Sequence, residues 1–264
     1  MILLAPFPEK QYNESMEIKR FFVSHEVPVK IGEPIRIYGD EFIHAVKVSR
    51  YKVGYKLILS NGDGFDYFCV VTEVGKDFFE CVPERAEKNG NELTVPLALY
   101  MCAIEKTDVA VQKATEIGAS EIRLMISAFT NAKNQNLDRL NKIALESAKQ
   151  CGRAVVPKIY APVSFEEGVE DAVKRFSKVI FCYENATSGR IASEISEKDS
   201  SVAIVIGSEG GFSPEEVRFA EERGAKVVTL GRRILRAETA CIVSLAFAAE
   251  ELEKYENLRS ESRM

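Results

Sequence analysis

Two stretches in the last third of the chain decide the fold: VAIVIGSEGGFSPEEV at residues 202–217 and KVVTLGRRILRAETACIVSL at residues 226–245. Each begins with a short, almost wholly apolar run, continues into a glycine-containing turn and ends in a helical pattern. Continuous apolar strands that alternate with helices are typical of a parallel sheet covered on both faces. Ligands of such sheets bind beyond the carboxyl ends of the strands, so the two turns are the first candidates for a functional site.

The first stretch carries a clear signal for the start of a helix. Ser213 is a good N-cap, Pro214 suits the first helical position, and Glu216 completes a capping box with Ser213. The sequence therefore predicts a strand that ends at Gly207 and a helix that begins near residue 214.

The turn between that strand and helix contains three glycines and a carboxylate. Glycines allow a sharp turn and a close approach of a ligand to backbone N–H groups. Their spacing is neither the dinucleotide fingerprint nor a P-loop. The carboxylate of Glu209 would repel a phosphate but would suit a cationic ligand or a ribose hydroxyl, and an ordinary structural turn is the alternative. The residues concerned are Gly207, Glu209, Gly210 and Gly211.

The second stretch places three arginines at the adjacent strand exit, before a helix over about residues 237–254. Guanidinium groups at a ligand-bearing edge bind phosphate or an anionic base through forked hydrogen bonds. Solvated loop charge is the alternative, and for Arg232 alone it is the interpretation that we accept. The helix is apolar nearly all round between Ala240 and Ala249, which predicts burial on more than one face. A second subunit or the chain's own sheet would provide the cover. The arginines are Arg232, Arg233 and Arg236.

The rest of the chain falls into two parts with different predicted secondary-structure patterns. Residues 93–256 continue the strand and helix alternation, with helices expected over about 107–117 and 137–151. The first part, residues 18–86, reads as short strands with an Asn-Gly-Asp-Gly turn at 61–64 and a helix at about 40–48, a pattern that predicts a small β-barrel. Residues 1–17 precede it as an arm, and the polar stretch 85–92 is a plausible linker.

Composition excludes several classes of protein. The chain has 264 residues, 46% hydrophobic content and a net charge of −5, which argues against a generally basic nucleic-acid binder but allows a local basic surface. Its six scattered cysteines and two histidines form no zinc-site spacing. No stretch resembles a signal peptide or a bilayer-spanning helix. We therefore expect a soluble cytoplasmic protein with reduced thiols, no metal and no membrane.

The motifs IGSEGGFSPEE and LGRRILRAETA, in this order, resemble the paired signature of the RsmE-type SPOUT RNA methyltransferases. QKATEIGASEI (112–122), ALESAKQCGR (144–153), VSRYKVG after His44 and the 61–64 turn also match, so the resemblance covers most of the chain after residue 18. Three positions depart from the family pattern, namely Ser208 for Pro, Gly54-Tyr55 for a Gly-Asp step, and Asn131-Ala132 for Arg-Ser.

The resemblance implies an α/β architecture with a PUA-like RNA-binding β-barrel at residues 18–86 and a SPOUT trefoil-knot domain with a mainly parallel sheet at residues 93–256. It also implies a homodimer whose site is completed across the interface. The two strand-exit loops would form the knot and bind S-adenosyl-L-methionine. The matching cofactor-binding positions are Gly207, Glu209, Gly210, Gly211, Leu230, Gly231, Ile234, Leu235 and Ala237.

The implied reaction is methylation of N3 of a uridine in 16S (small-subunit) ribosomal RNA. We expect Arg236, with Arg233, to stabilise negative charge on the uracil oxygens, and Glu238, Glu209 or water to accept the N3 proton. RNA would be positioned by Arg20, His44, Arg50 and Lys52 of the barrel and by Arg153 of the helical part, and for each of these an unpartnered surface residue is the alternative.

Three other interpretations remain open on the sequence. A SPOUT enzyme that methylates the ribose 2′-OH would share the cofactor loops and differ only in its product. A non-catalytic RNA-binding ribosome-assembly factor would lack cofactor binding. A nicotinamide dehydrogenase is the weakest alternative, because its fingerprint is absent.

Overall fold

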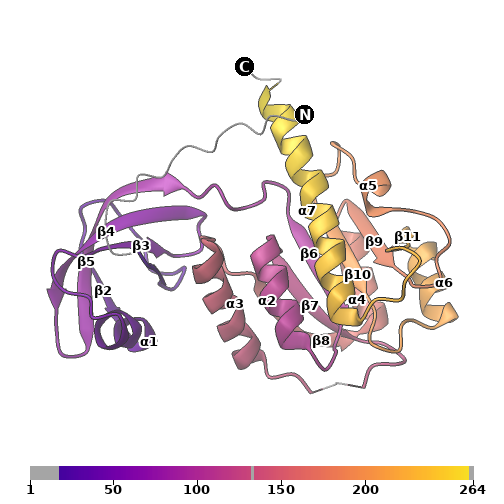
Figure 1. Cartoon of the computed structure of the whole chain (residues 1–264), viewed down its shortest axis with the longest axis horizontal. Coiled ribbons are helices and arrows are strands. Elements are labelled where there is room, and N and C mark those ends of the chain that lie inside the picture. Colours follow the sequence, from indigo (N-terminus) through magenta and orange to yellow (C-terminus); the bar gives the residue numbers. More distant parts are fainter. Residues whose placement is uncertain (1–17, 132–133, 262–264) are drawn as a thin grey trace. The chain divides into compact units, whose positions relative to one another are not determined.

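The computed structural model describes residues 18–131 and 134–261. The expected arm at residues 1–17 and the departure at Ala132 lie outside the described residues. The chain divides into two units, and the colours of Figure 1 follow the sequence through them from indigo to yellow. Of the described residues, the first unit comprises 18–23, 29–59 and 67–86, and the second comprises 24–28, 60–66, 87–131 and 134–261.

The first unit is built on a five-stranded sheet with the strand order β1-β3-β4-β5-β2. The pairs β3/β4 and β2/β5 are antiparallel. Buried and outward residues alternate along β4, with Tyr67, Cys69 and Val71 facing the core. The bounds are β1 Arg20–Phe22, β2 Ile35–Tyr38, β3 Lys56–Ser60, β4 Phe65–Val74 and β5 Phe78–Lys88.

The expected turn at 61–64 joins β3 to β4. Asn61 Oδ1 accepts a hydrogen bond from the Asp63 N–H (3.3 Å), and Asp63 Oδ1 accepts one from the Phe65 N–H (2.9 Å). Gly62 and Gly64 have φ angles of 86° and 87°, which glycine adopts without steric cost. The prediction of a hairpin at this place is confirmed.

The helix expected near residues 40–48 is present, but only its first turn is α-helical. Helix α1 spans Gly39–Phe42 and continues as a π-helical segment, η1, over Ile43–Val48. The wide hydrogen bond from the Ser49 N–H to the His44 carbonyl (2.9 Å) belongs to this second segment. Local sequence periodicity does not distinguish the two kinds of helix.

The second unit contains a six-stranded sheet with the order β11-β9-β10-β6-β7-β8, in which every neighbouring pair is parallel. This confirms the mainly parallel α/β sheet predicted from the apolar strands. The bounds are β6 Leu97–Cys102, β7 Glu121–Ile126, β8 Lys158–Ser164, β9 Lys178–Cys182, β10 Val202–Ile206 and β11 Lys226–Val228.

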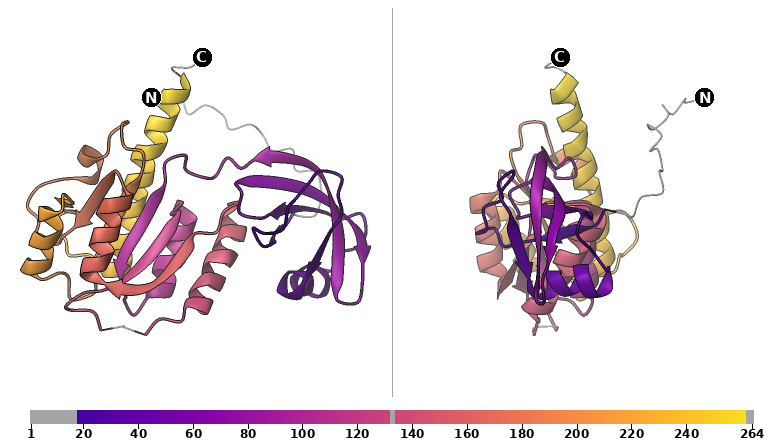
Figure 2. Two further views of the ribbon diagram at one scale, coloured as in Figure 1. Left: turned by 180° about the vertical axis from the view of Figure 1, so that it is seen from behind. Right: turned by 90° about the vertical axis from the view of Figure 1, so that its left-hand side faces the viewer.

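Helices cover both faces of this sheet, and Figures 1 and 2 show the two layers from opposite sides. Helices α2, α3, α5 and α7 share one buried cluster with the strands, whereas α4 and α6 share the other. The bounds are α2 Thr107–Ile117, α3 Leu137–Cys151, α4 Phe165–Arg175, α5 Ile191–Glu194, α6 Pro214–Glu222 and α7 Ala237–Glu261.

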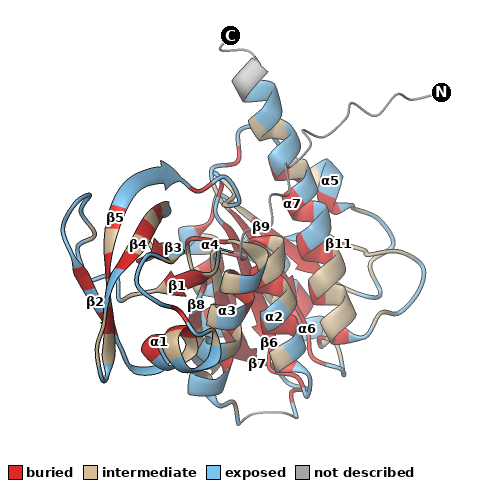
Figure 3. Ribbon diagram, turned by 60° about the vertical axis from the view of Figure 1, so that its left-hand side comes forward, coloured by how far each residue is buried: buried red, intermediate tan, exposed pale blue. Residues whose placement is uncertain are grey.

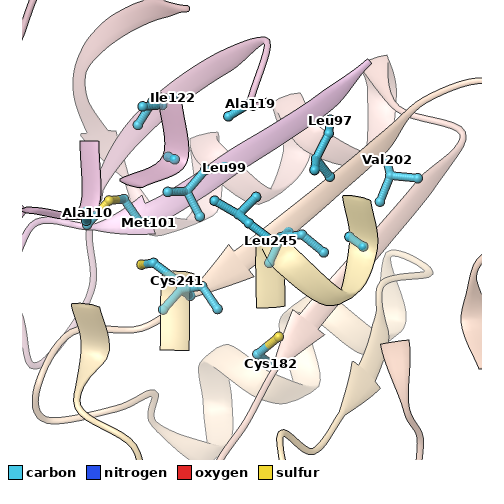
Figure 4. Packing of buried hydrophobic residues seen from close by; sticks show 14 of the residues in the cluster. Leu97, Leu99, Met101, Ala110, Ala119, Ile122, Cys182, Val202, Cys241 and Leu245 are labelled. Atoms are coloured by element: carbon cyan, nitrogen blue, oxygen red, sulfur yellow. The ribbon is translucent and has the colours of Figure 1, made fainter. Parts of the chain in front are cut away.

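The central strands supply side chains to both clusters. On β6, Leu97, Leu99 and Met101 pack toward α2 and α7, whereas Ala98 and Tyr100 pack toward α4. Figure 4 shows the first set beside Cys241 and Leu245 of α7, and the strands are coloured as buried in Figure 3. Burial of each large apolar side chain contributes about 1.5–3 kcal/mol, so two-sided burial explains why these strands lack an alternating polar pattern.

Two parts of the chain differ from the expectation. Strand β5 extends to Lys88, so the first half of the polar stretch at 85–92 is an exposed strand end. Strand β8 and helix α4 were not predicted. Strand β8 lies at the edge of the sheet and contains Pro162, which weakens its strand signal. Helix α4 does carry a capping box, formed by Ser164 and Glu167, and this signal could have located it.

Among residues 18–131 and 134–261, no helix has the length and apolar character needed to cross a lipid bilayer.

Candidate active site

The turn after β10 has the local structure that its sequence predicts. Ser213 Oγ accepts a hydrogen bond from the Glu216 N–H (3.2 Å), Glu216 Oε2 accepts one from the Ser213 N–H (2.8 Å), and Pro214 begins α6. The Gly211 N–H donates to the Ser208 carbonyl (2.9 Å), and Gly211 has a φ angle of 71°. The predicted capping box is therefore confirmed.

The same turn is fixed against the segment that follows β7. Glu216, which is buried, accepts a second hydrogen bond from the Ala128 N–H (2.8 Å), and Ser208 Oγ donates to the Phe129 carbonyl (3.0 Å). A Cβ at position 210 would lie 2.6 Å from the Phe129 Cβ, so only glycine fits Gly210 against this neighbour. Ser208, at which the sequence departs from the motif that it resembles, thus forms a side-chain hydrogen bond that a proline could not make.

The second strand exit leads from β11 to α7. Thr229 Oγ1 accepts a hydrogen bond from the Gly231 N–H (3.1 Å), and Gly231 has a φ angle of 123°. Beyond it the chain is open to solvent, and Ile234 is 85% exposed. The side chains of Arg232, Arg233 and Arg236 are also exposed, and none forms a hydrogen bond or salt bridge with another described residue.

These two exits and the exit of β9 surround one pocket at the carboxyl edge of the sheet. This edge is a topological switch point, because the chain leaves β9 toward β10 but leaves β10 toward β11 on the other side of β9. The lining residues are Cys182, Tyr183, Glu184, Ile206, Gly207, Ser208, Gly211, Thr229, Leu230, Gly231, Arg233, Leu235 and Ala240.

The pocket brings together part of the predicted set. Of the expected cofactor residues, five line it, namely Gly207, Gly211, Leu230, Gly231 and Leu235, and so does Arg233. The remaining ones lie outside the lining, with Glu209, Gly210 and Ile234 in the same two loops and Ala237 at the start of α7. Sequence reasoning missed the third exit, Cys182 to Glu184. The apolar run VIFCY followed by a glutamate was the available signal, but its place beside β10 depends on the strand order.

The two carboxylates considered as proton acceptors are both bound to the loop after β6. Glu209 Oε1 accepts a hydrogen bond from the Glu105 N–H (3.0 Å), and Glu238 Oε1 accepts one from Lys106 Nζ (2.9 Å). The hydrogen bond from Lys106 lowers the pKa of Glu238 below its usual value. Glu238 is therefore held ionised, and a carboxylate with a lowered pKa is a weak base.

The predicted RNA-binding residues of the first unit differ in accessibility. Arg50 and Lys52 are exposed, and Arg50 has a φ angle of 57°. Arg20 on β1 is 9% exposed. His44 is half-buried, its ring lies 5.9 Å from that of Phe21, and its Nδ1 is buried without a hydrogen-bond partner among the described residues. The sequence could indicate the charge of these side chains but not their burial.

Arg153 lies in a different environment from the one we expected. It is 3% exposed, and its guanidinium forms two hydrogen bonds to Glu92 Oε2 (2.7 and 3.0 Å) and further ones to the carbonyls of Thr115 and Ala119. All three guanidinium nitrogens are thus engaged inside the second unit. Arg153 has a structural role here, and we do not retain it as an RNA contact. Its partner Glu92 is 61 residues away in the sequence, beyond the reach of local patterns.

Within residues 18–131 and 134–261, no group of three or more His, Cys, Asp or Glu side chains is arranged to hold a metal ion.

Comparison with known proteins relates this architecture to a family. Residues 89–249, more than half of the chain, match the family described as RNA methyltransferase domain, and residues 37–84 match the RNA methyltransferase PUA domain. A protein of Mesomycoplasma hyopneumoniae named ribosomal RNA small subunit methyltransferase E is 36% identical over 88% of this chain and 95% of its own length. The protein of the same name from Rickettsia conorii is 29% identical over the same shares of the two chains.

Solved structures show the same fold. The ribosomal RNA small subunit methyltransferase E of Neisseria gonorrhoeae, determined with bound S-adenosyl methionine, superposes with a TM-score of 0.78 at 24% identity, over 87% of this chain and 96% of that one. The predicted architecture, a PUA-like domain followed by an α/β methyltransferase domain with a mainly parallel sheet, is thereby confirmed. The chain belongs to the ribosomal RNA small subunit methyltransferase E family of RNA methyltransferases.

Proposed function

We propose that the protein transfers a methyl group from S-adenosylmethionine to N3 of a uridine in 16S ribosomal RNA, giving 3-methyluridine. The observation that supports this most directly is the pocket at the three strand exits, which lies between the two motifs that resemble the family signature. The names of the curated relatives indicate the small-subunit RNA as substrate.

The pocket has the chemistry that this cofactor requires. It lies at the carboxyl ends of parallel strands, where the ligands of such sheets bind. Its lining is largely apolar or glycine, so that backbone N–H and C=O groups are available for the polar edge of an adenine. We assign this role to Leu230, Gly231 and Leu235, and we assign the ribose and methionine side to Gly207 and Gly211. The loop residues outside the lining keep these groups in place.

S-adenosylmethionine, when bound, supplies a methyl group on a positively charged sulfur. Neutral uracil carries a proton on N3, which must leave as N3 attacks. We propose that Arg236, exposed and next to the pocket loop, donates hydrogen bonds to the uracil oxygens as negative charge develops on them. Glu238, ionised beside Lys106, is a weak acceptor for the N3 proton, which leaves Glu209 or water as the favoured one.

Three further parts of the proposal concern partners and location. The exposed cations Arg50 and Lys52, together with His44 and Arg20 of the same unit, would bind the RNA backbone. The target base must leave its stack to enter the pocket. The outward apolar face of α7 would be covered by a second copy of the chain, in a homodimer. A ribosomal RNA substrate would place the reaction in the cytoplasm.

Nucleoside mass spectrometry tests the proposal. Purified protein is incubated with S-adenosylmethionine and small ribosomal subunits that lack the modification, and the RNA is then digested to nucleosides. We expect 3-methyluridine to appear. A 2′-O-methyl nucleoside would instead identify an enzyme that acts on ribose, and RNA binding without methylation would identify an assembly factor. Subunits incubated without the cofactor are the control.

A further inference from the structure

Two charged side chains face the pocket from different strand exits. Among the lining residues, Glu184 from the β9 exit carries the only carboxylate and Arg233 from the β11 exit carries the only guanidinium. Both side chains are exposed, and neither forms a hydrogen bond or salt bridge with any residue that the structure describes. The pocket therefore presents one negative and one positive group, and neither is paired with another side chain among the described residues.

The Glu184 carboxylate lies against the backbone of Gly211. A Cβ at position 211 would overlap the carboxylate of Glu184, and the φ angle of 71° at Gly211 favours glycine independently. The carboxylate thus occupies the space that the glycine leaves free, at the wall of the pocket. Glu209, the acidic residue of the turn after β10, lies outside the lining and accepts a hydrogen bond from the Glu105 N–H.

We infer that Glu184 and Arg233 together bind the amino-acid end of S-adenosylmethionine. The Glu184 carboxylate accepts hydrogen bonds from the α-ammonium group, and the Arg233 guanidinium donates them to the α-carboxylate. This inference rests on the proposed function and deepens it. The amino-acid end is the zwitterionic part of this ligand, so a wall with one carboxylate and one guanidinium matches its two charges. Arg233 is thereby assigned to the cofactor, and Arg236 alone is left for the uracil.

Ligand analogues separate the two contacts, and affinity by isothermal titration calorimetry is the measurement. S-adenosylhomocysteine keeps the amino-acid end but has no methyl group to transfer, 5′-methylthioadenosine lacks that end, and decarboxylated S-adenosylmethionine lacks only the carboxylate. Loss of one charge-assisted hydrogen-bonded pair weakens binding by about 10- to 100-fold. We expect Glu184→Gln to weaken S-adenosylhomocysteine binding by about this factor and to leave 5′-methylthioadenosine binding unchanged.

The second variant gives an independent result. Arg233→Gln should weaken binding of S-adenosylhomocysteine by a similar factor but leave binding of decarboxylated S-adenosylmethionine at the wild-type level. Glu222→Gln and Arg232→Gln remove the same charges from exposed positions outside the pocket lining. Both control variants should bind all three ligands as the wild type does.

The possible failures are distinguishable. If the wild-type protein binds neither S-adenosylmethionine nor S-adenosylhomocysteine, the proposed function itself fails. If it binds them, and the Glu184 and Arg233 variants bind S-adenosylhomocysteine equally well, the inference is overturned while the proposed function stands. Equal weakening of 5′-methylthioadenosine by Glu184→Gln would also overturn it, because the carboxylate would then contact the ribose.

Discussion

Single side chains around the pocket differ in how firmly the protein holds them. Glu238 and Glu209 are bound to the loop after β6, and Glu216 is buried in a capping box, whereas Arg233 and Arg236 extend from an exposed loop. Groups with fixed partners are suited to shaping the site. Groups without hydrogen-bond partners in the described chain are suited to meeting a ligand.

The first prediction separates Arg236 from Glu238. Arg236→Ala should lower the single-turnover rate of RNA methylation by about 10²–10³-fold, because it removes a donor to the developing negative charge. Glu238→Gln should lower the rate by less than about 10-fold, since a carboxylate of lowered pKa contributes little as a base. Arg232→Ala is the matched control. A loss with Glu238→Gln as large as that with Arg236→Ala would show that Glu238 accepts the proton.

The second prediction concerns Glu216, which joins α6 to the segment after β7. Glu216→Ala removes the carboxylate that accepts hydrogen bonds from the Ser213 and Ala128 N–H groups. Both hydrogen bonds are partly buried. We expect a loss of about 1–3 kcal/mol in the free energy of unfolding, measured by urea denaturation. Glu221→Ala, on the exposed side of the same helix, serves as control and should change stability little. Equal effects of the two substitutions would refute the role of Glu216.

At the scale of elements, α4 is tied to β6 and β7 by a polar network. Tyr100 Oη donates to Asp171 Oδ2 (2.6 Å), and Arg175 binds both Asp171 (3.1 Å) and Glu121 (2.6 Å). Desolvation alone would raise the pKa of Asp171, but the hydrogen bonds from Tyr100 and Arg175 and the charge of Arg123 outweigh it. The pKa of Asp171 is therefore lowered from its ordinary 3.8.

The third prediction follows from the sign of that shift. A lowered pKa in the folded state stabilises the protein above pH 3.8, and this contribution is lost as the pH falls through the folded pKa. Asp171→Asn should therefore reduce the free energy of unfolding by on the order of 1 kcal/mol near neutral pH. The difference from the wild type should shrink below pH 3.8. Denaturation curves at several pH values measure it, and a difference that stays constant would contradict the assignment.

The sequence predicts those elements whose signals are local. The capping box of Ser213 and Glu216, the turn at 61–64 and the two-sided burial of β6 and β10 all follow from nearby residues. The Arg153 pair with Glu92 and the entry of Glu184 into the pocket do not, because both depend on which distant segments the fold places side by side. Local sequence patterns therefore indicate the chemical character of a residue but do not indicate its distant partners.

At the scale of the whole molecule, α7 links the pocket to the proposed dimer. Its inward residues Cys241, Leu245 and Leu252 are buried by the chain's own sheet and helices, whereas Phe247 is 46% exposed and Val243 is half-buried. One subunit therefore leaves part of the apolar surface of this helix exposed. A second copy is the occupant that we propose for the outer face.

The fourth prediction tests that occupant. Phe247→Glu places a charge in the proposed interface and should convert a dimer into a monomer, as measured by analytical ultracentrifugation. Glu250→Gln, on an exposed position one turn further along α7, is the control and should stay dimeric. A wild-type protein that is monomeric at all concentrations would refute the homodimer.

The most direct test of the central claim uses a strain of the source organism that lacks this protein. Nucleosides from its small ribosomal subunits are analysed by mass spectrometry, and the strain is then complemented with the wild-type protein or with Arg236→Ala. We predict that 3-methyluridine is absent, returns with the wild-type protein and stays absent or strongly reduced with the variant. Unchanged 3-methyluridine in the strain without the protein would contradict the claim.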